Sequence, residues 1–138
     1  MPAPLPPAYA AFLERFAAGA YWDAHERLEI AWRRNRSGFF KGLILLASAF
    51  VHAGRGNRHG VAAQLEKAAR ELAPYAPAYL GQDVSALLEC AARGQALAAR
   101  TGAPSTAAEW RALLPPPDLT PRAALFRGDE PELGALGA

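Results

Sequence analysis

Residues 39–53 form an apolar run in which Lys41, Ser48 and His52 are the only polar side chains. Its longest apolar part, residues 43–53, is interrupted by Ser48 and His52 and falls well short of the roughly 20 residues that a membrane-spanning helix needs. A helix that is apolar on nearly every side is stable in water only when other elements surround it. The run therefore predicts a buried helix at the centre of the fold.

Apolar residues also recur at helical spacing in the segments on either side of this run. The expected helices are residues 8–18, 21–35, 39–53, 58–72, 84–100 and a short one over 106–114. Gly19 is a typical helix stop, and Asn57, Asp83 and the Thr106-x-x-Glu109 pattern are typical helix starts. No segment alternates convincingly at period two, so we expect no sheet. The sequence predicts an all-α fold, a compact bundle of about five to six helices joined as antiparallel hairpins.

The length of 138 residues predicts a single helical domain over residues 1–138. Residues 1–7 form an extended lead-in, because four of them are proline. Residues 115–138 form a Pro- and Gly-rich tail. We expect Leu119, Leu125 and Phe126 in this tail to dock on the body and the last ten residues to fray.

The composition excludes some function classes. Only Lys41 and Lys67 are lysines among 15 basic residues, so the basic charge is mostly arginine, and the net charge is +2. Arginine suits phosphate and carboxylate recognition, but we favour the simpler explanation that the arginine content reflects a GC-rich genome. Scarce Asn, Gln, Cys and Met are thermophile-like. Cys90 is the single cysteine and excludes a disulfide within the chain. Without a basic, apolar leader we expect a cytoplasmic protein that does not contact membranes.

The helix over 21–35 carries the motif His25-Glu26-x-x-Glu29, with Trp32 on the same face. Lys41, Leu45, Ser48 and His52 share one face of the central helix. A short loop joins these helices, so we expect them to pack antiparallel. In such a hairpin, the residue numbers of two facing residues add up to nearly the same value along the whole pair. His25 then faces His52, and Glu29 faces Ser48, which brings the four side chains to one patch.

Two interpretations of this patch compete. His25, Glu29 and His52 are suitable ligands for a divalent metal, Zn or Mn, with Glu26 as the base that activates a bound water. The motif matches only the first half of the zincin pattern, because residue 29 is not histidine. The alternative is a polar seam that fixes the register of two packed helices. We favour the seam.

Arg55 lies in a glycine-rich turn, Gly54-Arg55-Gly56-Asn57, that could be taken for a phosphate-binding loop. The turn lacks the Lys-Ser/Thr pair and the preceding strand of a P-loop, so we interpret it as a connection between helices. The arginines at 33, 34 and 36 have no accompanying basic stripe or interleaved aromatic residues. Nucleic-acid binding is therefore not expected.

Three stretches together resemble the family catalogued as domain of unknown function 309. They are FAAGAYWDAHERLEIAW from Phe16, FKGLI from Phe40 and HAGRGN from His52. The resemblance covers about residues 10–75 and implies an all-α bundle with polar positions at His25, Glu26, Glu29, Trp32 and His52. The family usually has glutamine where this chain has Lys41 and Leu45. Lys41 could instead neutralise a carboxylate of the preceding helix.

These observations lead to two hypotheses. The first is a non-enzymatic interaction or structural module that uses the His/Glu seam and that could form a homo-oligomer. The second is a metal-dependent hydrolase with His25, Glu29 and His52 as ligands and Glu26 as base. Elemental analysis that finds no bound Zn or Mn would exclude the second. The sequence identifies neither a substrate nor a partner.

Overall fold

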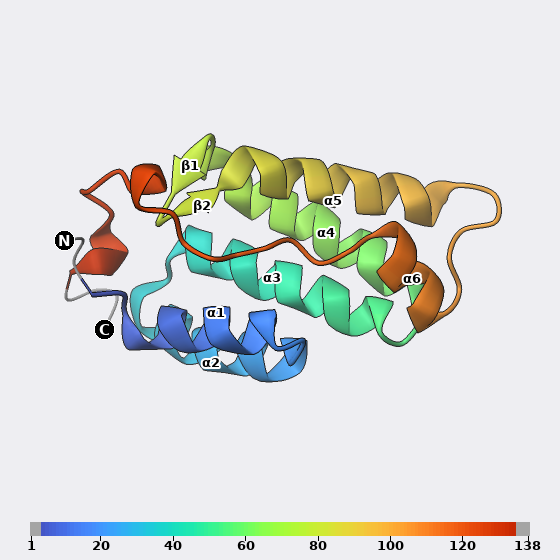
Figure 1. Ribbon diagram of the computed structural model, residues 1–138, viewed down its shortest axis with the longest axis horizontal. Coiled ribbons are helices and arrows are strands. Elements are labelled where there is room, and N and C mark those ends of the chain that lie inside the picture. The colour runs from blue at the N-terminus through green and yellow to red at the C-terminus, as the bar shows by residue number, and fades with distance from the viewer. Residues whose placement is uncertain (1–3, 135–138) are drawn as a thin grey trace.

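The computed structural model describes residues 4–134, and its described part is a bundle of six α-helices (Figure 1). The helices are α1 (Pro7–Ala17), α2 (Tyr21–Asn35), α3 (Gly38–Ala53), α4 (Arg58–Leu72), α5 (Val84–Ala99) and α6 (Ala107–Leu113). Each of the first four packs against the helix that follows it in the chain, in antiparallel hairpins, and α6 packs on α3. The predicted fold class is confirmed, and no predicted helix end differs from the observed one by more than one residue.

Side chains at the predicted helix starts satisfy backbone N–H groups that no helical carbonyl reaches. Asn57 accepts from the N–H of Gly60 at 3.1 Å, and Asp83 accepts from that of Ala86 at 2.9 Å. Thr106 accepts from the N–H of Glu109 at 3.1 Å. These N-caps confirm the starts of α4, α5 and α6.

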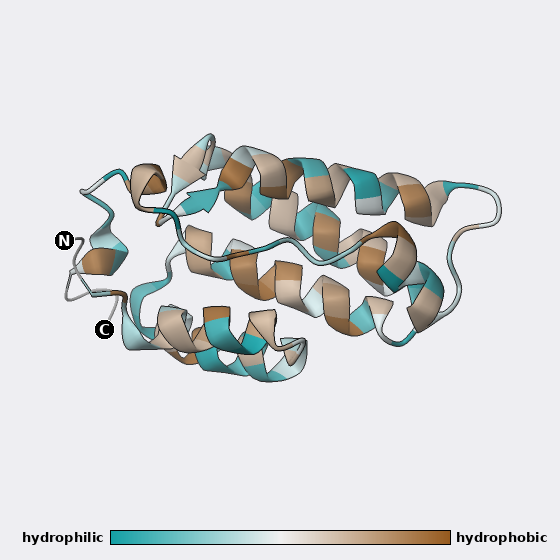
Figure 2. Ribbon diagram, viewed as in Figure 1, coloured by the Kyte–Doolittle hydropathy of each residue, from teal (hydrophilic) through white to brown (hydrophobic). Residues whose placement is uncertain are grey.

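The core is built around α3, which lies between the α1–α2 hairpin and the α4–α5 hairpin (Figure 1). Phe39, Phe40, Leu43, Leu46 and Ala47 of α3 are all fully buried. Figure 2 shows this helix mostly in brown, whereas the outer helices carry teal residues on their outward sides. Within residues 4–134 no helix combines the length and the apolar character needed to cross a bilayer.

A small antiparallel sheet contradicts the expectation that the chain has none. Strands β1 (Ala78–Tyr79) and β2 (Gln82–Asp83) pair Ala78 with Asp83 and Tyr79 with Gln82. The turn between them holds Leu80 at φ 47° and Gly81 at φ 81°, the left-handed values of a tight hairpin. Strands of two residues are too short to show an alternating pattern, which is why periodicity missed them.

The segment after α6, residues 115–134, runs back along α3 and α1 to the β1–β2 hairpin (Figure 1). We call it the C-terminal segment. Leu119 is buried, as predicted, and Phe126 packs against the core. The expectation that the last ten residues fray is wrong up to Gly134, because Glu130 and Glu132 are 3% and 4% exposed and hydrogen-bonded. Residues 135–138 lie outside the described part of the chain.

Candidate functional site

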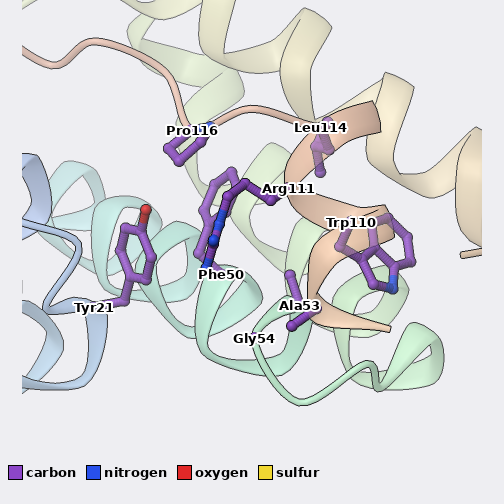
Figure 3. Close-up of a pocket in the computed structure, with 9 residues that line it drawn as sticks. Tyr21, Phe50, Ala53, Gly54, Trp110, Arg111, Leu114 and Pro116 are labelled. Carbon is purple, nitrogen blue, oxygen red and sulfur yellow. The ribbon is translucent and has the colours of Figure 1, made fainter. Parts of the chain in front are cut away.

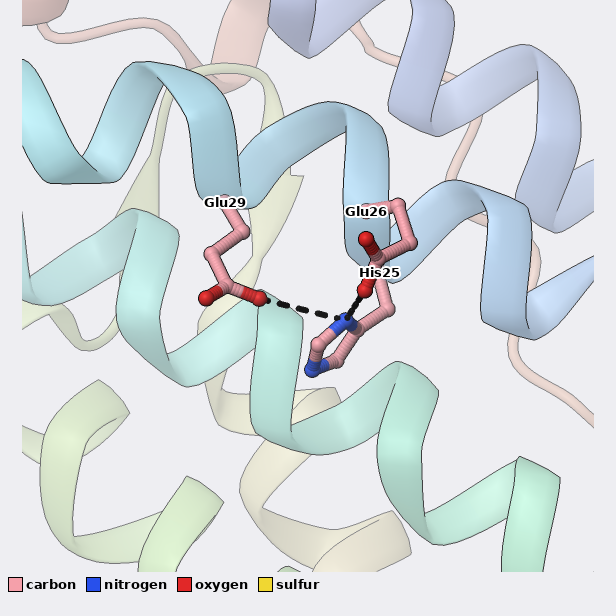
Figure 4. A group of neighbouring side chains, drawn as sticks. All are labelled: His25, Glu26 and Glu29. Carbon is pink, nitrogen blue, oxygen red and sulfur yellow. Dashed lines mark hydrogen bonds and ion pairs between the residues drawn. The ribbon is translucent and has the colours of Figure 1, made fainter.

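His25, Glu26 and Glu29 of α2 form a tight polar group (Figure 4). The Nδ1 atom of His25 lies 3.2 Å from Oε1 of Glu26 and 3.5 Å from Oε2 of Glu29. One ligand atom from each of the three side chains lies within 4.8 Å of the other two. Three side chains that can bind a cation therefore converge without any contribution from another helix.

Local helix geometry produces this convergence. His25 and Glu29 are one turn apart, so their side chains point the same way, from α2 toward α3 (Figure 4). Trp22, one turn before Glu26, stacks on the His25 ring with a centroid distance of 5.0 Å and an interplanar angle of 8°. The Trp22 ring covers the imidazole, whose side chain is only 17% exposed.

The carboxylate of Glu29 contacts two side chains of its own helix, Arg33 and His25. Its Oε1 accepts a hydrogen bond of 2.9 Å from Arg33, while Oε2 faces His25. Every ion pair of this group among the described residues lies within α2. The expected partners on the central helix do not take part in these contacts.

Lys41 contacts an aromatic ring rather than the carboxylate that we suggested. Its ammonium lies 4.4 Å from the centre of the Trp32 ring, and the guanidinium of Arg36 lies 4.5 Å from the same centre. The cation–π contact of Lys41 thus joins Trp32, near the end of α2, to the start of α3, while that of Arg36 lies at the end of α2 itself.

His52, Ser48 and Arg55 lie outside the three-residue group. The His52 Nδ1 pairs with the side-chain amide of Asn57 at 3.2 Å, and the ring packs directly on Gly60 of α4. Ser48 is half-buried in α3, and Arg55 is exposed in the turn between α3 and α4. His52 therefore braces this turn, and its role as a metal ligand stays a prediction.

The donor set of the group matches what a borderline divalent cation accepts. One imidazole nitrogen with two carboxylate oxygens suits Zn or Mn. Glu26 is 52% exposed, and its carboxylate lies as close to His25 and Glu29 as a shared metal ion would require. Its position therefore suits a third metal ligand as well as the base that was expected.

A second polar group, formed around Glu130 and Glu132 of the C-terminal segment, was not predicted. Glu132 accepts hydrogen bonds from the Ser37 and Tyr79 hydroxyls, at 2.6 and 2.5 Å. Glu130 accepts from the backbone N–H groups of Leu80, Arg127 and Gly128. Burial alone would raise the pKa of Glu130, but these donors outweigh it and hold the pKa below its ordinary value. Since the partners are distant in sequence, no local pattern indicates them.

Comparison with known proteins gives one match. Residues 9–64 match the profile of a family described as a domain of unknown function, DUF309. The matched segment begins in α1 and ends in α4, and it includes the three residues of the α2 group and His52. No curated protein and no solved structure shows a significant match.

Proposed function

We propose that this chain, whose residues 9–64 match the DUF309 family, is a non-enzymatic helical module that self-associates through the outward face of α2. The observation that carries the proposal is the exposure of Trp22 and Ile30. The exposed fractions of these two residues are 58% and 57%, and they are the large hydrophobic residues that the described part of the chain exposes to solvent. Every other large apolar side chain in residues 4–134 is at least partly buried.

Trp22 and Ile30 belong to one surface of α2. Trp22, Glu26 and Ile30 follow one another at intervals of four residues, and Ala24, Leu28 and Ala31 face the core on the opposite side. Burying two such side chains at an interface stabilises it by about 1.5–3 kcal/mol for each fully buried one. This exposed surface therefore supports a contact with another apolar surface.

The distribution of charge on α2 favours a second copy of the chain as the partner. Glu26 lies in the first half of the helix, and Arg34 in the second half has no ion-pair partner among the described residues. An antiparallel pair of α2 helices centred on Ile30 sets each Glu26 against the partner's Arg34, because both lie four residues from the centre. A two-fold contact of this kind is self-complementary.

Sedimentation equilibrium across micromolar to millimolar concentrations tests the proposal. We expect a reversible dimer for the unaltered protein and a monomer for the double variant W22A/I30K. The matched control is Ala92→Lys, which adds the same charge at an exposed position of α5 and should leave the dimer intact. A monomer at every concentration, or a dimer that the double variant does not weaken, would exclude self-association through α2.

A divalent-metal site at His25, Glu26 and Glu29 is the second candidate. The observation in its favour is that the three ligand atoms lie within 4.8 Å of one another. A bound Zn or Mn would supply a Lewis acid and lower the pKa of a bound water, as a hydrolase requires. In this chain His25 and Glu29 would hold the ion, while Trp22 keeps water from one side of the imidazole.

Calorimetric titration with ZnCl2 and MnCl2 tests the second candidate. Binding at one equivalent that is lost in His25→Ala and in Glu29→Gln would support it. His59→Ala is the control, because His59 is exposed at the start of α4 and outside the group. Absence of binding, or equal binding by the His25 and His59 variants, would exclude the site.

A further inference from the structure

A small hollow lies where the start of α2, the end of α3 and α6 meet (Figure 3). Its volume is about 320 Å³, including space open to solvent. The side chains that carry the argument are those of Tyr21, Phe50, Ala53, Trp110, Arg111 and Leu114. The hollow is distinct from the His25 group and from the outward face of α2.

The floor of the hollow is apolar and aromatic. Phe50 is 5% exposed, and its ring lies 5.5 Å from that of Tyr21, with Phe16 packed behind both. Leu114 and Trp110 of the α6 region close the other side and are almost fully buried. Pockets for small molecules typically combine such walls with a few polar groups that fix orientation.

The polar side-chain groups at this hollow are all hydrogen-bond donors or can act as donors. The Arg111 guanidinium extends across the mouth near Phe50 (Figure 3), and it has no hydrogen bond or ion pair with residues 4–134. The Tyr21 hydroxyl likewise has no such partner in that range. The indole of Trp110 contributes its apolar ring, because its Nε1 lies on the side away from Phe50 and Arg111 (Figure 3). No aspartate or glutamate lines the hollow.

The charge and protonation states of Arg111 and Tyr21 make the hollow complementary to an anion. Burial raises the pKa of Tyr21, and the nearby positive charge of Arg111 opposes the rise only in part, so the phenol stays a neutral donor at pH 7. A guanidinium is always charged and forms two parallel hydrogen bonds with a carboxylate. An uncharged ligand would leave the guanidinium without this partner.

We propose that the hollow binds a small monocarboxylate with an aromatic or branched apolar body. The carboxylate pairs with Arg111 and accepts a hydrogen bond from Tyr21. The apolar body lies against Phe50 and Leu114, beside the Trp110 indole. The ligand class follows from a single unpaired cation above an apolar floor, since a dianion or a phosphate would need further donors.

Titration of the ¹⁵N-labelled full chain with benzoate, followed by NMR, tests the proposal. The indole N–H signal of Trp110 reports on the hollow, while those of Trp22 and Trp32 on α2 serve as internal controls. We expect a saturable shift of the Trp110 signal with benzoate and a much weaker one with benzyl alcohol, which has the same ring without the charge.

The variant Arg111→Gln should weaken benzoate binding roughly tenfold or more, since a charge-assisted hydrogen bond is lost. Arg100→Gln removes the same charge from an exposed position at the end of α5 and should have no effect. Tyr21→Phe, which keeps the ring and removes the hydroxyl, should weaken binding by less. The proposal is overturned if benzoate causes no saturable shift of Trp110, if benzyl alcohol binds equally well, or if Arg111→Gln binds like Arg100→Gln. Dimerisation through α2 is measured independently by sedimentation equilibrium and does not depend on this result.

Discussion

The hydroxyl of Ser37 donates a 2.6 Å hydrogen bond to Oε2 of Glu132, a residue 95 positions further along the chain. Ser37 is also the N-cap of α3, where its Oγ accepts from the N–H of Phe40. The other carboxylate oxygen of Glu132 accepts from the Tyr79 hydroxyl of β1. One buried carboxylate thus joins the start of the central helix, the hairpin and the C-terminal segment.

Replacing Glu132 by glutamine should destabilise the fold. The amide has one acceptor oxygen where the carboxylate has two, so either Ser37 or Tyr79 faces an NH2 group instead of an acceptor. We expect a loss of about 2 kcal/mol in the free energy of unfolding, measured by urea denaturation. Glu66→Gln is the control, because the Glu66–Arg70 pair is mostly exposed and should contribute less than about 1 kcal/mol. Equal losses in the two variants would contradict the bridging role of Glu132.

Glu130 should make stability depend on pH in the acid range. Burial works against its charge, but backbone donors, those of Arg127 and Leu80 foremost, lower its pKa in the folded protein. A carboxyl group with a lowered folded pKa contributes stability above its unfolded pKa of about 4.3, and loses it as the pH falls through the folded value. Glu130→Gln should therefore be less stable than the unaltered protein at pH 7. The free energies of unfolding of the two proteins, measured by denaturation at successively lower pH, should converge. A difference that stays constant with pH would refute this account.

Tyr79 should make the stability of the fold depend on pH in the alkaline range, where its contribution decreases as the pH rises. Burial raises its pKa, and the hydrogen bond to Glu132 and that carboxylate's charge raise it further. A neutral phenol with a raised folded pKa contributes stability that is complete below its unfolded pKa of about 10 and decreases as the pH rises above it. Tyr79→Phe should therefore lose stability less steeply between neutral and alkaline pH. Parallel thermal melts of both proteins measure this slope, and identical slopes would count against it.

The helices were predictable because their signals are local. The spacing of apolar residues located α2 and α4 at their observed bounds, and the side chains of Asn57 and Asp83 indicated the next helix starts. The convergence of His25 with Glu29 follows from helix geometry alone, since residues one turn apart share a face. Such inferences need no knowledge of the tertiary arrangement.

Contacts between distant parts of the chain were not predictable in the same way. Pairing residues of α2 and α3 by a constant sum assumes a helix rotation that the sequence does not specify. In the structure His52 pairs with Asn57, and Lys41 lies over Trp32. The buried Glu132 lies among the last ten residues, which were expected to fray, and its partners are at least 53 residues away in the sequence. Only the folded arrangement brings them together.

Gly42 is the position where close packing of two helices is most directly testable. It faces α4 from the first half of α3, and a Cβ atom added there would lie 2.5 Å from both Cγ and Cδ2 of Leu72. Alanine is the better helix former by about 1 kcal/mol, so propensity favours Gly42→Ala. The steric overlap outweighs this gain and makes the substitution destabilising, because Leu72 is 1% exposed and its Cγ cannot move without shifting α4.

We therefore expect Gly42→Ala to lower the free energy of unfolding by roughly 1–3 kcal/mol, as overpacked cores do. Gly54→Ala is the matched control, since Gly54 ends the same helix with φ −64°, is exposed, and would place its Cβ no closer than 3.4 Å to another atom. That variant should be neutral or more stable by a few tenths of a kcal/mol, because alanine restricts the unfolded chain. Urea denaturation of both variants measures the difference. If Gly42→Ala were as stable as Gly54→Ala, α3 and α4 would have room to separate and the close contact at Leu72 would not limit their packing.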